Sequence, residues 1–92
     1  MSPVRSYQQW YVYVLLSKET GRWYIGSTKN MQKRIFTHNA GKNRSTKHGV
    51  PWKLIYYEVG LNRDDARARE KYLKSGMGHR YLRNRLKFFF AV

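Results

Sequence analysis

The chain has 92 residues, which suffice for one small domain, and it contains no cysteine, so disulfide frameworks and thiolate metal sites are excluded. Nineteen Lys and Arg stand against five Asp and Glu, which gives a formal net charge of +14 at pH 7. No apolar run approaches the ~20 residues of a membrane span, and residues 1–10 lack the apolar core of a signal peptide, so a soluble, cytoplasmic protein is expected.

The positive charge is the most informative bulk property of the sequence. A field of this sign on a small domain favours a polyanionic partner, either nucleic acid or an anionic membrane surface. The sequence has no basic amphipathic helix of the membrane-binding kind, so we expect nucleic acid and no membrane partner. Composition does not separate a binding protein from a nuclease, and it identifies no protein partner.

Two runs near the amino terminus, 10–16 (WYVYVLL) and 23–27 (WYIGS), are rich in aromatic and β-branched residues and predict strands. The segment between them is polar and contains glycine, so a β-hairpin is expected. Asn30 then offers a side chain to cap a helix over 31–40, and Gly41 can end that helix.

The rest of the chain predicts one more strand and two more helices. Residues 41–51 are polar and basic and indicate a loop, and 52–59 (WKLIYYEV) indicate a third strand. Asn62 can cap a helix over 63–76, and 77–90 predict a final helix. The expected order is therefore β-β-α-β-α-α.

This order predicts a small α/β (α+β) fold, with a three-stranded, mainly antiparallel sheet and helices packed on it. No internal repeat, linker or low-complexity tract divides the chain. We therefore expect a single domain over residues 1–92, with a core of about 10–87.

Helical spacing brings three charged or polar side chains towards buried helix faces. Arg34 and His38 are four residues apart and lie at the border of the inward face of the first predicted helix. Glu70 falls on the face that Ala66 and Leu73 bury in the second. A carboxylate on an inward face is uncommon unless it is paired or binds a cation.

Each of these residues also has an ordinary structural interpretation. Glu70 can form an ion pair with Arg34 or another cation, and Arg34 can lie on a solvated helix face. His38 can complement the negative end of its helix. Tyrosines on strands, here Tyr13 and Tyr24, commonly serve as half-buried packing residues. Taken singly, the residues favour packing over a reaction site.

The tripeptides YVY at 11–13 and YIG at 24–26 are followed along the chain by three polar residues, Arg34, His38 and Glu70. This ordered set resembles the GIY-YIG endonuclease family. The second tripeptide matches outright, whereas the first retains only Tyr13, with Tyr11 and Val12 in place of Gly and Ile, a replacement that small bacterial members tolerate. The resemblance covers roughly residues 10–87 and points to the short, single-domain bacterial type.

The resemblance implies hydrolysis of DNA phosphodiester bonds with one divalent metal ion, Mg²⁺ or Mn²⁺. It places Tyr13 and Tyr24 side by side on the sheet, with Arg34 at the scissile phosphate. Glu70 then binds the metal, and His38 positions the nucleophile or relays its proton. Tyr13 is taken as the general base and Tyr24 as the orienting group, with the reverse assignment left open.

These residue types suit phosphodiester hydrolysis. A phenol can act as a base if neighbouring cations lower its pKa from about 10. The guanidinium of Arg34 can stabilise negative charge that accumulates on phosphorus, and Mg²⁺ held by one carboxylate and waters can stabilise the leaving oxygen. With five acidic residues in the chain, a one-metal site is favoured over a two-metal site.

Other residues have less specific assignments. Asn84 corresponds loosely to an asparagine often found late in the family's fold. A basic set in the predicted loop and the third strand is expected to bind backbone phosphate: Lys42, Arg44, Lys47 and Lys53. His48 and His79 match no motif and are taken as surface or loop residues.

Three functions are compatible with these features. The first is a Mg²⁺-dependent endonuclease acting on branched, flapped or damaged DNA, with a role in repair or recombination. The second is a non-catalytic module on a nuclease fold that binds DNA or RNA, and the third is a small basic structural protein of a ribonucleoprotein. Glu70 favours the first, because a binding protein has no need of a carboxylate facing a positive groove.

Overall fold

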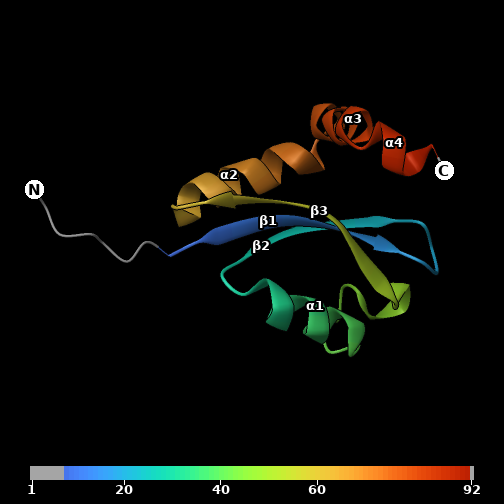
Figure 1. The fold of residues 1–92 in the computed structure, drawn as a ribbon. Helices are drawn as coiled ribbons and strands as arrows, with labels where there is room; N and C mark the ends of the chain where they lie inside the picture. Colours follow the sequence, from blue (N-terminus) through green and yellow to red (C-terminus); the bar gives the residue numbers. More distant parts are fainter. Residues whose placement is uncertain (1–7, 92) are drawn as a thin grey trace, which may run out of the picture.

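The computed structural model describes residues 8–91 (Figure 1). Its centre is a sheet of three strands, β1 (Trp10–Ser17), β2 (Trp23–Thr28) and β3 (Trp52–Gly60), in the order β2-β1-β3. Both pairings are antiparallel, which confirms the predicted sheet. The outer strands β2 and β3 each keep one unpaired edge within the described sheet. The expected absence of a signal peptide was drawn from residues 1–10, of which residues 1–7 lie outside the described residues.

Helices cover the two faces of this sheet, in the predicted order β-β-α-β-α-α (Figure 1). On one face lies α1 (Met31–Asn39), and on the other lie α2 (Arg63–Lys74), α3 (Gly76–Arg85) and the short α4 (Lys87–Phe90). The predicted loop before β3 contains one turn of 3₁₀ helix, η1 (Lys47–Gly49). No helix among residues 8–91 is long and apolar enough to cross a membrane.

The carboxy-terminal helices are divided differently from the prediction. Ser75 separates α2 from α3: its hydroxyl accepts a hydrogen bond from the N–H of Gly78 at 3.1 Å and thereby caps the new helix. The sequence predicts one helix over 77–90, but the backbone leaves helical geometry at Leu86, with φ −109° and ψ 25°. The break after α2 was predicted at Gly76, next to its observed place, but no Pro or Gly marks the break at Leu86, so periodicity alone joined residues 77–90.

Alternate side chains of β1 point to opposite faces of the sheet and pack in two separate cores. Val12 and Val14 point to α2 and α3 and pack there with Ile25, Ala66, Leu73 and Leu82. Tyr13 and Leu15 point to α1 and pack with Trp52. Because both faces of β1 are buried, its sequence is almost continuously apolar or aromatic. The same alternation places Tyr13 on the face that carries α1.

Both ends of α1 are anchored. At its start the Asn30 side chain accepts the N–H of Lys33 at 3.1 Å, as predicted for an N-cap. At its end the Asn39 amide donates to the carbonyl of Trp52 at 3.0 Å and accepts the Trp52 N–H at 2.6 Å, which ties the helix to the beginning of β3. Gly41 follows in the left-handed conformation, with φ +71°, in agreement with its predicted role.

Candidate active site

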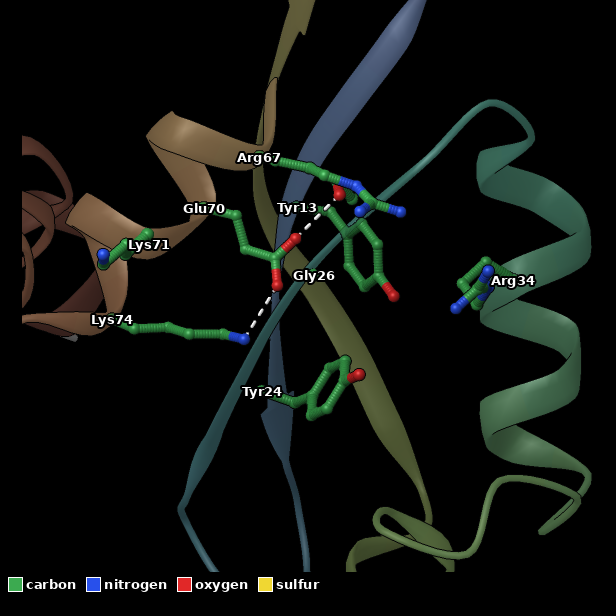
Figure 2. Close-up of a pocket in the computed structure, with 9 residues that line it drawn as sticks. Tyr13, Tyr24, Gly26, Arg34, Arg67, Glu70, Lys71 and Lys74 are labelled. Carbon is green, nitrogen blue, oxygen red and sulfur yellow. Dashed lines mark hydrogen bonds and ion pairs between the residues drawn. The ribbon is translucent and has the colours of Figure 1, made fainter. Parts of the chain in front are cut away.

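A pocket of about 460 Å³ opens beside β2, and four of the five predicted catalytic residues line it (Figure 2). Each of the four comes from a different element: Tyr13 from β1, Tyr24 from β2, Arg34 from α1 and Glu70 from α2. In Figure 2 the two tyrosine rings lie between the helix that carries Glu70 and the helix that carries Arg34. The fold thus gathers residues that are far apart in the sequence.

Gly26 allows the Tyr13 ring to lie across β2. The two residues are direct partners in the register of β1 and β2. A Cβ atom at position 26 would lie 2.6 Å from the Tyr13 hydroxyl oxygen and 2.8 Å from Cζ, closer than real Cβ contacts come. Tyr13 therefore forms a buried floor of the pocket, with its ring 6.2 Å from that of the partly exposed Tyr24. The tyrosines lie side by side, as the resemblance implies.

His38 is fully buried although it lies in the last turn of α1. Its Nε2 is 3.0 Å from the Tyr13 hydroxyl, and its Nδ1 is 2.8 Å from the Thr46 hydroxyl. Burial lowers the pKa of His38, and the charge of Arg34 lowers it further, so the imidazole is held neutral. A neutral ring has one donor and one acceptor nitrogen, which makes Tyr13–His38–Thr46 a continuous buried hydrogen-bond chain.

The Tyr13 phenol keeps its proton in the free protein. Burial raises the pKa of Tyr13, the neighbouring Tyr24 raises it further, and Arg34 opposes these effects only in part. From the sequence we expect nearby cations to lower the pKa of such a phenol, but for Tyr13 desolvation outweighs them. A base role for Tyr13 therefore needs a second group that takes its proton, and His38 Nε2 is in hydrogen-bond contact with it.

Glu70 is partly buried and holds two hydrogen bonds (Figure 2). Its Oε1 accepts from the Ser27 hydroxyl and its Oε2 pairs with the Lys74 ammonium, both at 2.7 Å. Burial by itself would raise the pKa of Glu70, but the bonds from Lys74 and Ser27 and the charges of Lys74 and Arg67 outweigh it and hold the pKa below its ordinary range. The ion pair left open for Glu70 thus exists, with Lys74 and not with Arg34.

The donor set is compatible with a single divalent ion. Glu70 is the single acidic side chain among the described residues that line the pocket, and residues 8–91 contain no cluster of three or more His, Cys, Asp or Glu. Mg²⁺ is commonly held by one or two carboxylates and completes its shell with waters and substrate phosphates. Lys74 is about half exposed, so its ammonium can leave Glu70 at little cost when another cation arrives.

Three cations on α2 also line the pocket and were not predicted: Arg67, Lys71 and Lys74. Arg67 lies three residues before Glu70 and Lys74 four residues after it, so these two share its helix face, whereas Lys71 follows Glu70 directly. That spacing was available in the sequence and could have identified Arg67 and Lys74. Thr46 could not have been found in this way, because its contact with His38 depends on how the loop after α1 turns back.

The remaining predicted residues lie outside this pocket. Lys42, Arg44 and Lys47 are exposed on the segment between α1 and β3. Lys53 lies over the ring of Phe89, 5.4 Å from its centroid. Asn84 is exposed on α3 and lines a separate depression there. The structure therefore brings together Tyr13, Tyr24, Arg34, His38 and Glu70, and it does not bring Asn84 to them.

Paired phenols, an arginine and one carboxylate around a basic pocket define a nuclease-type site on an α+β fold. A sequence profile described as the GIY-YIG catalytic domain matches residues 9–90. The chain belongs to the GIY-YIG family, which confirms the resemblance. A nuclease-type function with a nucleic acid substrate follows at the level of the family, whose nucleases generally use a divalent metal.

Its relatives are small bacterial members of the same family, described as UPF0213 proteins. One from Clostridium perfringens is 42% identical over 65 residues, which cover 70% of this chain and 69% of that protein. One from Lacticaseibacillus paracasei is 36% identical over 72 residues, covering 77% and 80%. The solution NMR structure of a UPF0213 protein from Bacillus halodurans matches with a TM-score of 0.50 and 30% identity, over 80% of this chain and 81% of that one.

Proposed function

We propose that the protein is an endonuclease that hydrolyses DNA phosphodiester bonds with Mg²⁺ or Mn²⁺. The observation that carries this proposal is the buried chain Tyr13–His38–Thr46, which ends in the pocket that Arg34 and Glu70 line. A sheet that only packs needs no proton-accepting chain leading inward from a basic pocket. The chain of contacts has the elements of a proton relay beside a phosphate-binding arginine.

In this proposal Tyr13 takes a proton from the attacking water while its own proton moves to His38 Nε2. The transfer requires the His38 tautomer that carries hydrogen on Nδ1. Thr46 favours that tautomer: its hydroxyl lies 3.4 Å from the carbonyl oxygen of Asn43 and can donate there, while its oxygen accepts from Nδ1 at 2.8 Å. Tyr24 orients the water or the phosphate from the neighbouring strand.

Arg34 stabilises the negative charge that develops on the phosphate. It takes part in no ion pair among the described residues, so its guanidinium is available to a substrate, and the cations on α2 add to the same field. Glu70 would hold the divalent ion, which supplies charge stabilisation at the leaving oxygen. Ser27 orients the Glu70 carboxylate for this role.

The proposed substrate is branched, flapped or damaged DNA, as expected of an enzyme of repair or recombination. A chain of 92 residues offers little surface for reading a long base sequence beside its catalytic pocket. RNA is the competing polymer, and a binding module without catalysis is the competing function.

The test is incubation with labelled duplex, nicked and flapped DNA, and with matched RNA, in Mg²⁺, in Mn²⁺ and in chelator. We expect metal-dependent cutting that falls about 10²- to 10³-fold in Arg34→Ala, the usual cost of removing one charge-stabilising group. Arg22→Ala, which removes an exposed arginine in the β1–β2 turn, is the matched control and keeps the wild-type rate. Binding without cutting in every metal would leave the non-catalytic module as the function.

A further inference from the structure

A second depression, of about 590 Å³, continues the candidate active site towards the connection between β2 and α1. Three residues line both hollows: Ser27, Arg34 and Arg67. The far part of the second depression is lined by Trp10, Lys29 and Lys33. The two hollows therefore form one groove, with Arg34 and Arg67 at the point where they meet.

The second depression carries charge of one sign. Four of its nine lining residues are cationic and none is acidic: Lys29, Lys33, Arg34 and Arg67 are the four. None of these four takes part in an ion pair among residues 8–91. The other polar lining residues are hydroxyl and amide side chains, which suit phosphate and sugar oxygens. The depression thus has the chemistry of a site for a phosphodiester chain.

An aromatic side chain lies among these cations. Trp10 is partly buried, packs against the core beneath α2, and also lines the depression. The ammonium of Lys29 lies over its ring, 5.4 Å from the centroid. Aromatic faces interleaved with lysine and arginine are the usual platform on which proteins stack unpaired bases.

We propose, building on the proposed nuclease function, that this depression binds the nucleotide next to the scissile phosphate. The backbone of that nucleotide lies on Lys33 and Arg67, and its base stacks on Trp10, where it replaces the Lys29 ammonium. Inside a duplex both faces of a base are covered by its neighbours, so we take the base that stacks on Trp10 to be unpaired and displaced from the stack. The substrate class is therefore DNA with an unpaired nucleotide beside the cut.

The test measures affinity, in chelator, for a labelled flap substrate in which an abasic residue is moved through each position around the junction. At one position the wild-type affinity falls roughly tenfold, the usual value of one stacked base. The Trp10→Leu protein binds more weakly and is insensitive to the abasic residue at that position, whereas Trp10→Phe remains sensitive. Trp23→Leu is the matched control, since Trp23 stacks on Phe90 and lines neither hollow, and it keeps the wild-type pattern.

The inference is overturned if the affinity of the wild-type protein is the same for every position of the abasic residue. It is also overturned if Trp10→Leu loses as much affinity as the wild-type protein at the sensitive position. If Trp10→Leu fails to fold, emission is followed instead in the Trp23→Phe protein, in which the buried Trp52 is the other remaining tryptophan and gives a constant background. The intact substrate quenches the Trp10 part of the emission and the abasic one does not; equal quenching by both contradicts the inference. These measurements need no cutting. They therefore fail independently of the proposed function, which fails when bound DNA is not cut in any metal.

Discussion

Among single residues, the proposed proton transfer depends on the pair formed by Tyr13 and His38. Both side chains are fully buried, and the Tyr13 hydroxyl oxygen lies 3.0 Å from His38 Nε2. Burial favours the neutral form of each, because it raises the pKa of the phenol and lowers the pKa of the imidazole. A neutral imidazole is a proton acceptor, whereas a protonated one is not. The contact is therefore ready to receive a proton from the pocket.

Replacing Tyr13 by Phe removes this acceptor route while keeping the ring. We expect Tyr13→Phe to lower kcat about 10²- to 10⁴-fold, the range of general-base catalysis, with little change in binding. Tyr24→Phe should cost less, because no hydrogen bond joins the Tyr24 hydroxyl to His38 in the structure. Single-turnover cutting measures both. A larger loss in Tyr24→Phe would reverse the roles of the two tyrosines.

The burial of His38 predicts a pH dependence of stability. The His38 ring faces Tyr13, Tyr24 and Arg34, and its pKa is lowered in the folded protein. The unfolded chain therefore binds more protons than the folded protein once the pH falls below the ordinary histidine pKa of about 6.5. The free energy of unfolding is therefore at its highest above about pH 6.5, as far as His38 is concerned, and decreases as the pH falls below this value. Urea unfolding across this range measures the effect.

The matched variant for this measurement is His38→Gln, which keeps polar atoms and does not titrate. It should unfold with the same free energy across the window in which the wild-type protein loses stability. The pKa values of Glu58 and Glu70 are also lowered, but these two groups change the free energy of unfolding only near and below about pH 4, outside this window. A wild-type protein whose stability is flat between about pH 6.5 and 5 would show that His38 is not buried as described.

Among the elements, the edge strand β2 gives the site its opening. It pairs with β1 on one side only, and at Gly26 it presents backbone where any other residue would place a side chain against Tyr13. The pocket therefore joins the α1 face of the sheet to Ser27 and Glu70 beside α2. The glycine of the second tripeptide is thus required by space, since its φ is not positive.

Gly26→Ala tests this requirement. A methyl group 2.6 Å from the Tyr13 oxygen forces the ring to move, so we expect a loss of about 1–3 kcal/mol in the free energy of unfolding, as for overpacked cores, together with a loss of cutting. Thermal and urea unfolding measure the first. Gly60→Ala, at the end of β3 with nothing within 4 Å of its Cβ position, is the control and should be nearly neutral. Equal stability of the two variants would contradict the close approach.

Sequence reasoning reached the strands, the caps and the order of elements, because these depend on local residue patterns. Asn30 and Gly41 bound α1 as predicted, and Glu70 shares a buried face with Ala66 and Leu73. The break between α2 and α3 was predicted at Gly76, one residue from its position at Ser75, whereas the break at Leu86 was missed because no Pro or Gly marks it. The contact of Thr46 with His38 depends on tertiary structure, so a single sequence carried no sign of it.

At the scale of the whole molecule, the +14 charge and the continuous groove predict that nucleic acid binding depends strongly on salt. Five cations line the groove without an acidic partner among the described residues: Lys29, Lys33, Arg34, Arg67 and Lys71. Each neutralised phosphate releases counterions, so affinity falls as a power of the salt concentration. The exponent counts the phosphates in contact.

Binding measured between about 50 and 200 mM salt should give a log–log slope near −4 if the five groove cations carry the contact. A slope near −7 would indicate that four further exposed cations, those predicted from the sequence, also contact phosphates: Lys42, Arg44, Lys47 and Lys53. A slope shallower than about −2 would contradict a groove that follows the backbone over several phosphates.

The central claim is that the pocket at β2 is a metal-dependent nuclease site, and the cutting rate of Glu70→Ala tests it most directly. Glu19→Ala, which removes an exposed carboxylate from the β1–β2 turn, is the matched control. With a flapped DNA substrate and Mg²⁺, we predict a loss of about 10²-fold or more in Glu70→Ala, wild-type cutting in Glu19→Ala, and retained binding in both. Metal-dependent cutting by Glu70→Ala at the wild-type rate would contradict the account.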